Sequence, residues 1–424
     1  MSLLLACGYA GLEMEVDVNE NVKKPKVRFK GYEDAWEQRK LGNVCSRVQG
    51  NDGRMELPTL TISAGNGWMR QEDRFSGNIA GKEQRNYTLL HRGELSYNHG
   101  NSKLAKYGAV FSLQTYEEAL VPRVYHSFKV ENGDADFVEY YFATKLPDKE
   151  LGKLISSGAR MDGLLNIGYE EFMGIPFLFP NEEEQSKISS YFRTLDHLIT
   201  LHQRECEQAK KYKKYMLQKM FPQNGSNVPE IRFSGFTYAW EQRKLPEFVT
   251  FYNGQTYTPD DVQESGTLVL RSSNVKNGEI VDADNVYINP EIASADNVQE
   301  GDIIVVVRNG SRALIGKHAQ IKDPKPNTVI GAFMSGMRSE HSSFVNALLD
   351  TSAFENEIAK NMGATINQIT GYMFSKMEFV IPTDDEQEKI GEYFANLDHL
   401  ITLHQQKCEE LQKIKKFMLQ NMFV

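Results

Sequence analysis

The nonapeptide Leu-Asp-His-Leu-Ile-Thr-Leu-His-Gln occurs twice in the chain, at residues 195–203 and again at residues 397–405. It lies within a longer repeat, because residues 182–221 align without gaps on residues 384–423, with 25 of 40 positions identical. In both copies apolar residues recur at alternating steps of four and three, which is the heptad pattern of a coiled coil. The repeat therefore predicts two long helices, each about 60 Å in length.

The same repeat predicts how these helices begin and pack. Asn181 stands three residues before Glu184, and Thr383 stands three residues before Glu386, a spacing typical of a capped helix N-terminus. Because the helices match in sequence and a whole module lies between them in the chain, we expect them to pack antiparallel around a pseudo-twofold axis. The predicted seam residues are Ile188, Phe192, Leu195, Ile199, His202, Cys206, Ala209, Lys213, Met216 and Met220, with their counterparts from Ile390 to Met422.

A second repeated block opens each half of the chain. Residues 25–41 align on residues 229–245 with 11 of 17 positions identical, including an unbroken Ala-Trp-Glu-Gln-Arg-Lys-Leu. The middles, 42–180 and 246–382, have nearly equal lengths but only scattered correspondences. An internal repeat of this kind determines the domain organisation of the chain. One explanation is free drift after an old duplication. The functional explanation, which we favour, is two modules on a common scaffold that bind different targets.

Length and charge bound the class of protein. The 424 residues suffice for two or three domains. The net charge is −9, which by itself argues against an indiscriminate polyanion binder. The charge is uneven, because residues 25–180 are neutral whereas residues 229–382 carry −6.

The cysteines and the N-terminal segment predict a cytoplasmic protein without a membrane anchor. Four scattered cysteines, the first of them Cys7, form neither a disulfide framework nor a CxxC pair. The apolar run at residues 3–7 is far shorter than the roughly 20 residues of a membrane span. We interpret residues 1–24 as a loosely ordered extension and assign them no role.

Motifs for chemistry are missing from the sequence. No GxxxxGK[ST], GxSxG, HExxH or NPPY run occurs. The run Pro147 to Lys153 superficially resembles a nuclease motif, but its acids are too close together to lie on successive strands. His202, Cys206, His404 and Cys408 could form a zinc site, although packing in the helical seam is the simpler interpretation, so we predict no metal. The chain is predicted to be a binding protein and not an enzyme.

The middles are predicted to be mixed β-structure with short helices. Strands are expected at 174–179, 267–270, 303–307 and 377–381, and Asn-Gly pairs mark tight turns. The loops near these strands hold the side chains of direct base readout, since Arg and Lys pair with guanine and Asn with adenine. Polar loops are also common without such a role. The candidate DNA-binding residues are Asn98, His99, Asn101, Lys103, Arg271, Ser273, Asn274, Lys276, Arg308, Asn309 and Arg312.

Three repeated motifs resemble one known family. They are Pro-x-[Val/Ile]-Arg-Phe-x-Gly-[Tyr/Phe]-x-x-Ala-Trp-Glu-Gln-Arg-Lys-Leu, Pro-x-x-x-Glu-Gln-x-Lys-Ile and the Leu-Asp-x-x-Ile helix. In content, order and duplication they resemble the specificity subunit of type I restriction-modification systems, over about residues 25–424. The stretch 271–278 also resembles a segment common in the recognition domains of that family.

The resemblance implies a noncatalytic subunit that binds double-stranded DNA. Each middle would read one half of a split sequence, the coiled coil would set the gap, and the repeated blocks would bind two methylation subunits. The assembled complex would methylate adenine N6, and restriction subunits would add an ATP-dependent endonuclease. S-adenosylmethionine, ATP and Mg would belong to those partners, with no cofactor in this chain. Rival hypotheses are a noncatalytic scaffold that binds proteins or glycans and a free-standing nuclease.

The expected fold class is α+β, with two pseudo-repeated mixed α/β target recognition domains separated by two long antiparallel coiled-coil helices. The expected organisation is an N-terminal extension (1–24), a first recognition domain (25–180), a first helix (181–222), a linker (223–228), a second recognition domain (229–382) and a second helix (383–424).

Overall fold

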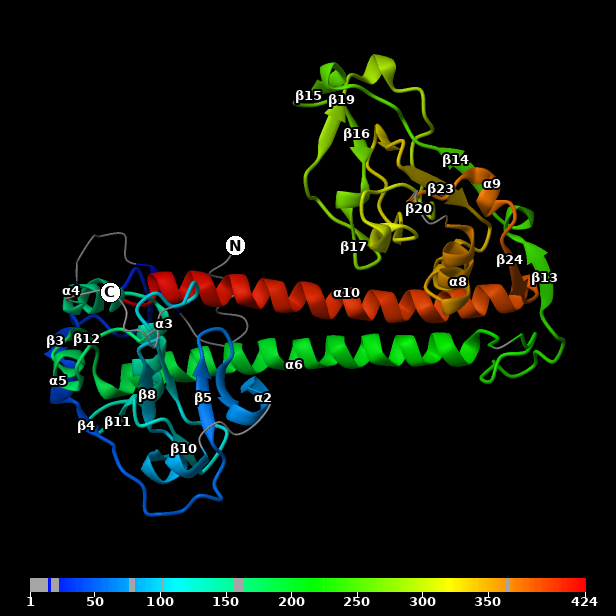
Figure 1. The fold of residues 1–424 in the computed structure, drawn as a ribbon. Coiled ribbons are helices and arrows are strands. Elements are labelled where there is room, and N and C mark those ends of the chain that lie inside the picture. Colours follow the sequence, from blue (N-terminus) through cyan, green and yellow to red (C-terminus); the bar gives the residue numbers. More distant parts are fainter. Residues whose placement is uncertain are drawn as a thin grey trace. The chain divides into compact units, whose positions relative to one another are not determined.

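The computed structural model describes residues 14–16, 23–75, 81–100, 102–155, 164–223, 225–362 and 367–424. The chain forms two compact units, one from Met1–His202 with Gln406–Val424 and the other from Gln203–Gln405. Each unit therefore contains one module, part of the long helix α6 (Glu182–Met220) and part of the long helix α10 (Asp384–Asn421) (Figure 1).

A four-stranded antiparallel sheet forms the centre of each module. In the first unit the strand order is β4-β11-β8-β9, and in the second it is β14-β23-β20-β21. The two sheets have the same topology when strands are matched in chain order, although the sequences of the two middles hardly align. The strands are β4 (Cys45–Arg47), β8 (Leu95–Asn98), β9 (Ala109–Ser112), β11 (His126–Val130), β14 (Thr250–Asn253), β20 (Ile303–Val306), β21 (His318–Gln320) and β23 (Met334–Arg338).

Further elements surround each sheet in a similar order. The first unit adds β1 (Met14–Val16), β2 (Val27–Phe29), β3 (Glu37–Lys40), β5 (Leu60–Ser63), β6 (Gly67–Arg70), α2 (Gln71–Phe75), β7 (Thr88–His91), β10 (Glu118–Val121), α3 (Ala135–Ala143), α4 (Asp148–Leu154), α5 (Tyr169–Met173) and β12 (Pro176–Phe179). The second adds β13 (Glu241–Lys244), β15 (Val262–Gln263), β16 (Thr267–Leu270), β17 (Val275–Lys276), β18 (Glu279–Ile280), β19 (Val286–Ile288), β22 (Thr328–Ile330), α7 (Ser342–Leu349), α8 (Ser352–Asn361), α9 (Gly371–Phe374) and β24 (Glu378–Ile381).

The predicted strands are confirmed, and so is the tight turn predicted at Asn277 and Gly278, whereas Asn253 of another predicted Asn-Gly turn lies in strand β14. Asn277 and Gly278 have φ angles of 54° and 77°, as a tight two-residue turn between β17 and β18 requires. A further difference lies near the N-terminus. Residues 14–16, which the sequence analysis assigned to a loose extension, form strand β1 against β2.

The two repeated blocks of each half meet in space. Strand β3 from the first block pairs with β12, which leads directly into α6, and β13 pairs in the same way with β24 before α10. Arg28 donates from Nε and Nη2 to Glu184 at 2.7 and 2.8 Å. Arg232 makes the same double contact with Glu386, at 2.7 Å for both bonds. Both glutamates are fully buried, so each ion pair joins a module to the first turn of its helix.

These ion pairs correct part of the capping prediction. Asn181 caps α6 as expected, because its Oδ1 accepts from the backbone N–H of Glu184 at 2.9 Å. Glu184, however, binds Arg28 and does not reach back to the cap, so the capping box is incomplete. The arginine outcompetes the backbone amide because a bidentate charge-assisted contact is the stronger one.

Within each unit the two helices run antiparallel, as predicted. In the first unit Phe192 contacts Phe423, with ring centroids 5.8 Å apart, and Lys415 donates to Asp196 at 2.5 Å. In the second unit the equivalent Lys213 donates to Asp398 at 2.6 Å. The lysines at the predicted seam positions are therefore neutralised by an aspartate of the facing helix.

Loss of one buried glutamate tests the joint between module and helix. We expect Glu386→Gln to lower the free energy of unfolding of the second unit by about 3–5 kcal/mol, because Arg232 would remain buried without a counter-charge. The measurement is urea-induced unfolding of the full chain, read from the second unit by hydrogen exchange. Glu241→Gln removes one partner of an exposed pair with Arg243 and should cost less than about 1 kcal/mol. Equal losses of unfolding free energy in the two variants would contradict a structural role for the ion pair between Arg232 and Glu386.

Candidate nucleic-acid interface

Two loops of the second unit bring together several of the predicted DNA-binding residues. One loop follows β16 and carries Arg271 and Ser273, and the other follows β20 and carries Arg308 and Asn309. The Nδ2 of Asn309 donates to the hydroxyl of Ser272 at 3.1 Å, which ties the loops to each other. Residues of the loop after β16 and of the turn before β23 line a pocket of about 500 Å³ at this surface.

The two arginines of this surface differ in their partners. Arg308 is exposed, and its guanidinium carbon lies 5.0 Å from the ring centroid of Phe333. Arg271 instead donates from Nη2 to both the carboxylate and the backbone carbonyl of Asp284. Both Nη2 hydrogens of Arg271 thus have acceptors within the protein. A two-point contact with guanine that uses Nη2 therefore requires Arg271 to release Asp284.

Asn274 has a structural position that the sequence analysis did not foresee. Its side chain is fully buried, and its Oδ1 accepts from the backbone N–H of Arg271 at 2.9 Å. Its Nδ2 donates to the carbonyl of Ala283 at 2.7 Å and to Asn285 at 2.9 Å. Asn274 therefore holds the loop in shape, and we no longer propose a base contact for it.

The other candidates of the second unit are exposed at its surface. Ser273 follows Arg271 in the first loop, Lys276 lies on β17, and Arg312 begins a short 3₁₀ turn after the second loop. Their exposure is compatible with a contact to DNA.

In the first unit the loop after β8 occupies the position of the loop after β20. Asn98 donates to the carbonyl of Ile62 at the end of β5, at 3.2 Å, and accepts from the backbone of Gly100. Lys103 is exposed. Asn101 lies outside the described residues.

His99 differs from its prediction because it is only 4% exposed. Its two ring nitrogens each lie 2.9 Å from a carbonyl oxygen, those of Leu165 and Val124. Its ring centroid is 4.9 Å from that of His126. The imidazole therefore fixes the loop after β8 through its contacts with these two carbonyl groups. We no longer propose that it reads a base.

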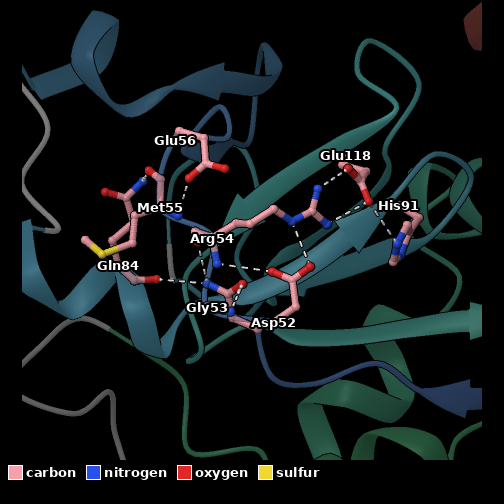
Figure 2. Close-up of polar contacts among 9 residues, drawn as sticks. Asp52, Gly53, Arg54, Met55, Glu56, Gln84, His91 and Glu118 are labelled. Carbon is pink, nitrogen blue, oxygen red and sulfur yellow. Dashed lines mark hydrogen bonds and ion pairs between the residues drawn. The ribbon is translucent and has the colours of Figure 1, made fainter.

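A polar cluster near β7 and β10 of the first unit was missed by the sequence analysis. Arg54 donates to Asp52 at 2.7 Å and to both oxygens of Glu118 at 2.7 and 2.9 Å, as Figure 2 shows. The hydrogen bond from Arg54 holds the pKa of Glu118 below its ordinary value. This arginine is thus neutralised by two carboxylates, which disfavours a role in phosphate binding.

The residues of the hypothetical zinc site that fall in the second unit have protein partners. The thiol of Cys206 lies 3.9 Å from the carbonyl of Ile401, and Nδ1 of His404 lies 3.1 Å from Glu205.

Among the described residues no helix is long and apolar enough to cross a membrane.

Comparison with known proteins shows what the chain is similar to. Residues 238–413 match the family described as the type I restriction modification DNA specificity domain. The predicted resemblance is thereby confirmed over this segment, which includes most of the second module. The chain as a whole is similar to type I restriction-modification specificity subunits.

Two particular proteins illustrate the similarity. The type I restriction enzyme MjaVIII specificity subunit of Methanocaldococcus jannaschii is 23% identical over 301 residues, covering 68% of this chain and 69% of that protein. The S subunit of a type I restriction-modification system from M. genitalium, a solved structure, is 14% identical with a TM-score of 0.64. That match covers 95% of this chain and 99% of the other, and it confirms the predicted fold class.

The half-buried imidazole of His126 generates a prediction about pH. Burial lowers the pKa of His126 to about 4, whereas an unfolded histidine titrates near about 6.5. The unfolded state therefore binds a proton that the folded state excludes, so the stability of the first unit falls as pH drops from about 6.5 to about 4. We expect His126→Gln to flatten this dependence in urea unfolding curves. A ring titration by NMR with a midpoint near about 6.5 would contradict it.

Proposed function

We propose that this chain is the sequence-specific DNA-binding subunit of a type I restriction-modification system, with one half of a bipartite sequence read by each module. The observation that carries the proposal is the duplicated surface. In the first unit Asn98, the last residue of β8, donates to the carbonyl of Ile62 in β5. In the second unit Asn309, in the loop after β20, donates to Ser272 in the loop after β16. Two modules with the same sheet topology but different loop residues are suited to recognise two different DNA sequences.

The proposed readers are the polar residues that remain accessible on this surface. An exposed arginine such as Arg308 can donate to guanine O6 and N7, and asparagine side chains suit adenine N6 and N7. In the first module the proposed contacts are Asn98, Lys103 and, from the sequence alone, Asn101. In the second they are Arg271, Ser273, Lys276, Arg308, Asn309 and Arg312.

In this proposal the catalytic chemistry belongs to the partner subunits. Two methylation subunits would bind the repeated blocks and use S-adenosylmethionine, and restriction subunits would supply ATP-dependent cleavage with Mg. The net charge of −6 on residues 229–382 fits a chain that discriminates bases while its partners supply most of the phosphate contacts. The isolated chain should therefore bind DNA weakly. The helices α6 and α10 would set the gap between half-sites, and the complex would work in the cytoplasm.

The noncatalytic scaffold for proteins or glycans is the less favoured function. Residues 238–413 match a DNA specificity domain, and among the described residues of this surface no observation points to a protein or a glycan. Failure of the complex with methylation subunits to bind any duplex would revive this alternative.

Exchange of one module tests whether each module recognises one half of the bipartite sequence. Replacing residues 42–180 with the corresponding segment of another specificity subunit should change one half of the recognised sequence and leave the other half intact. Mapping of methylated adenines in DNA exposed to the chimeric complex gives the result. The unchanged half serves as an internal control for assembly. A change in both halves, or in neither with full methylation retained, would refute the two-module proposal.

A single arginine tests direct readout. Arg308→Ala should cost about 1–3 kcal/mol on the cognate duplex and relax the preference at one base pair of the second half-site. Lys325→Ala removes an exposed positive charge elsewhere in the same unit and should leave base preference unchanged. Affinities are measured on the cognate duplex and on its single-base variants, at one fixed salt concentration. Equal weakening by Arg308→Ala on all sequences would assign this residue to the phosphate backbone.

A further inference from the structure

An exposed apolar side chain occupies the same topological position in both units. Val124, in the turn between β10 and β11, is 50% exposed, and Phe333, in the turn between β22 and β23, is 55% exposed. Each turn leads into the same strand of its four-stranded sheet. Single exposed apolar residues are common on protein surfaces, but these two share one place in a duplicated frame whose loop sequences differ.

Each of these apolar tips, Val124 and Phe333, contacts the candidate DNA-binding loop of its own unit. The carbonyl of Phe333 accepts from the backbone N–H groups of Val307 and Arg308 at 3.0 and 3.2 Å. The carbonyl of Val124 lies 2.9 Å from Nε2 of His99. The tips are therefore held against the loops through the backbone, which leaves the side chains free to face outward.

The turn that carries Phe333 is fixed by its other backbone groups as well. The N–H of Gly331 donates to the carbonyl of Leu270 at 2.8 Å, and that of Ala332 donates to the carbonyl of Gln255 at 3.0 Å. In the first unit the hydroxyl of Tyr125, next to Val124, accepts from the N–H of Ile62 at 3.3 Å. A fixed backbone that presents an apolar side chain is pre-organised for binding.

Phe333 also lies among the polar candidates of the second unit. Arg308 stacks over its ring, and Phe333 lines the same pocket as Arg271 and Ser273. In the major groove only one base-edge group is apolar, the 5-methyl group of thymine, and an apolar side chain such as Phe complements it. The ring has no hydrogen-bonding group with which to read the other edges.

We infer that Phe333 and Val124 are specificity-determining residues that each contact the 5-methyl group of a thymine in their own half-site. This inference rests on the proposed function and assigns the apolar part of base readout. Arg308, stacked on Phe333, then reads a base next to that thymine.

The test uses the complex with methylation subunits and duplexes in which single thymines are replaced by uracil, which lacks only the methyl group. The recognised sequence is first determined by selection from a randomised duplex library. The wild-type complex should lose about three- to fivefold in affinity at one thymine in each half-site, the expected worth of one buried methyl group. Phe333→Ala should lose this sensitivity in one half-site only, and Val124→Ala in the other.

Two further variants separate the methyl contact from an effect on Arg308. Phe333→Leu keeps an apolar contact but removes the ring under Arg308, so it should retain the sensitivity to uracil. Val262→Ala shortens an exposed valine on β15 of the same unit, 45% exposed, and should behave as wild type. If Phe333→Leu behaves like Phe333→Ala, the ring acts through Arg308 and the inference is overturned.

The inference can fail while the proposed function stands. Sequence-specific binding without any response to uracil would overturn the methyl contact alone. A rise in 2-aminopurine fluorescence on binding that Phe333→Ala abolishes would identify a wedge that unstacks bases, and would overturn it too. Absence of sequence-specific binding to any duplex would instead refute the proposed function.

Discussion

The duplicated buried ion pair is the constraint on which both units depend. Arg28 with Glu184, and Arg232 with Glu386, join the first repeated block of each half to the opening turn of a long helix. Removing two charges from water costs free energy that only good geometry offsets. Such a pair contributes little net stability over an apolar contact, but its two-point contact is directional. The path of the chain from module to helix is thereby fixed in both units.

Around this joint the modules can vary without loss of their frame. Both units pair a strand of the first repeated block with the strand before the long helix, namely β3 with β12 and β13 with β24. The four-stranded sheets of the two units also have the same strand order. What differs is the loops at the strand ends, where a side chain contributes little to the core. A binding surface built at such ends can change its residues while the register of the sheet stays the same.

The sequence predicted the frame far better than it predicted the site. Repeated blocks and heptads specify burial along a regular element, so the helices, their antiparallel packing and several strands could be derived. A polar residue in a loop has no such constraint. Asn274 and His99 have the side chains of base readers but satisfy the backbone of their own loops, and only the three-dimensional structure separates the two uses. Phe333 carries no sequence signal because its exposure comes from the turn.

The composition of the first unit has a consequence for synthesis on the ribosome. Its core includes Leu411 and Met418 of α10 and Phe423 just after that helix, and Phe423 packs on Trp36 with ring centroids 6.1 Å apart. The second unit is continuous from Gln203 to Gln405, so all of it emerges before the segment that the first unit still lacks. The first unit therefore cannot complete its core in the usual order, in which N-terminal domains fold first. The nascent first module must wait with part of its apolar core uncovered, and this interval is the one in which chaperones would matter most.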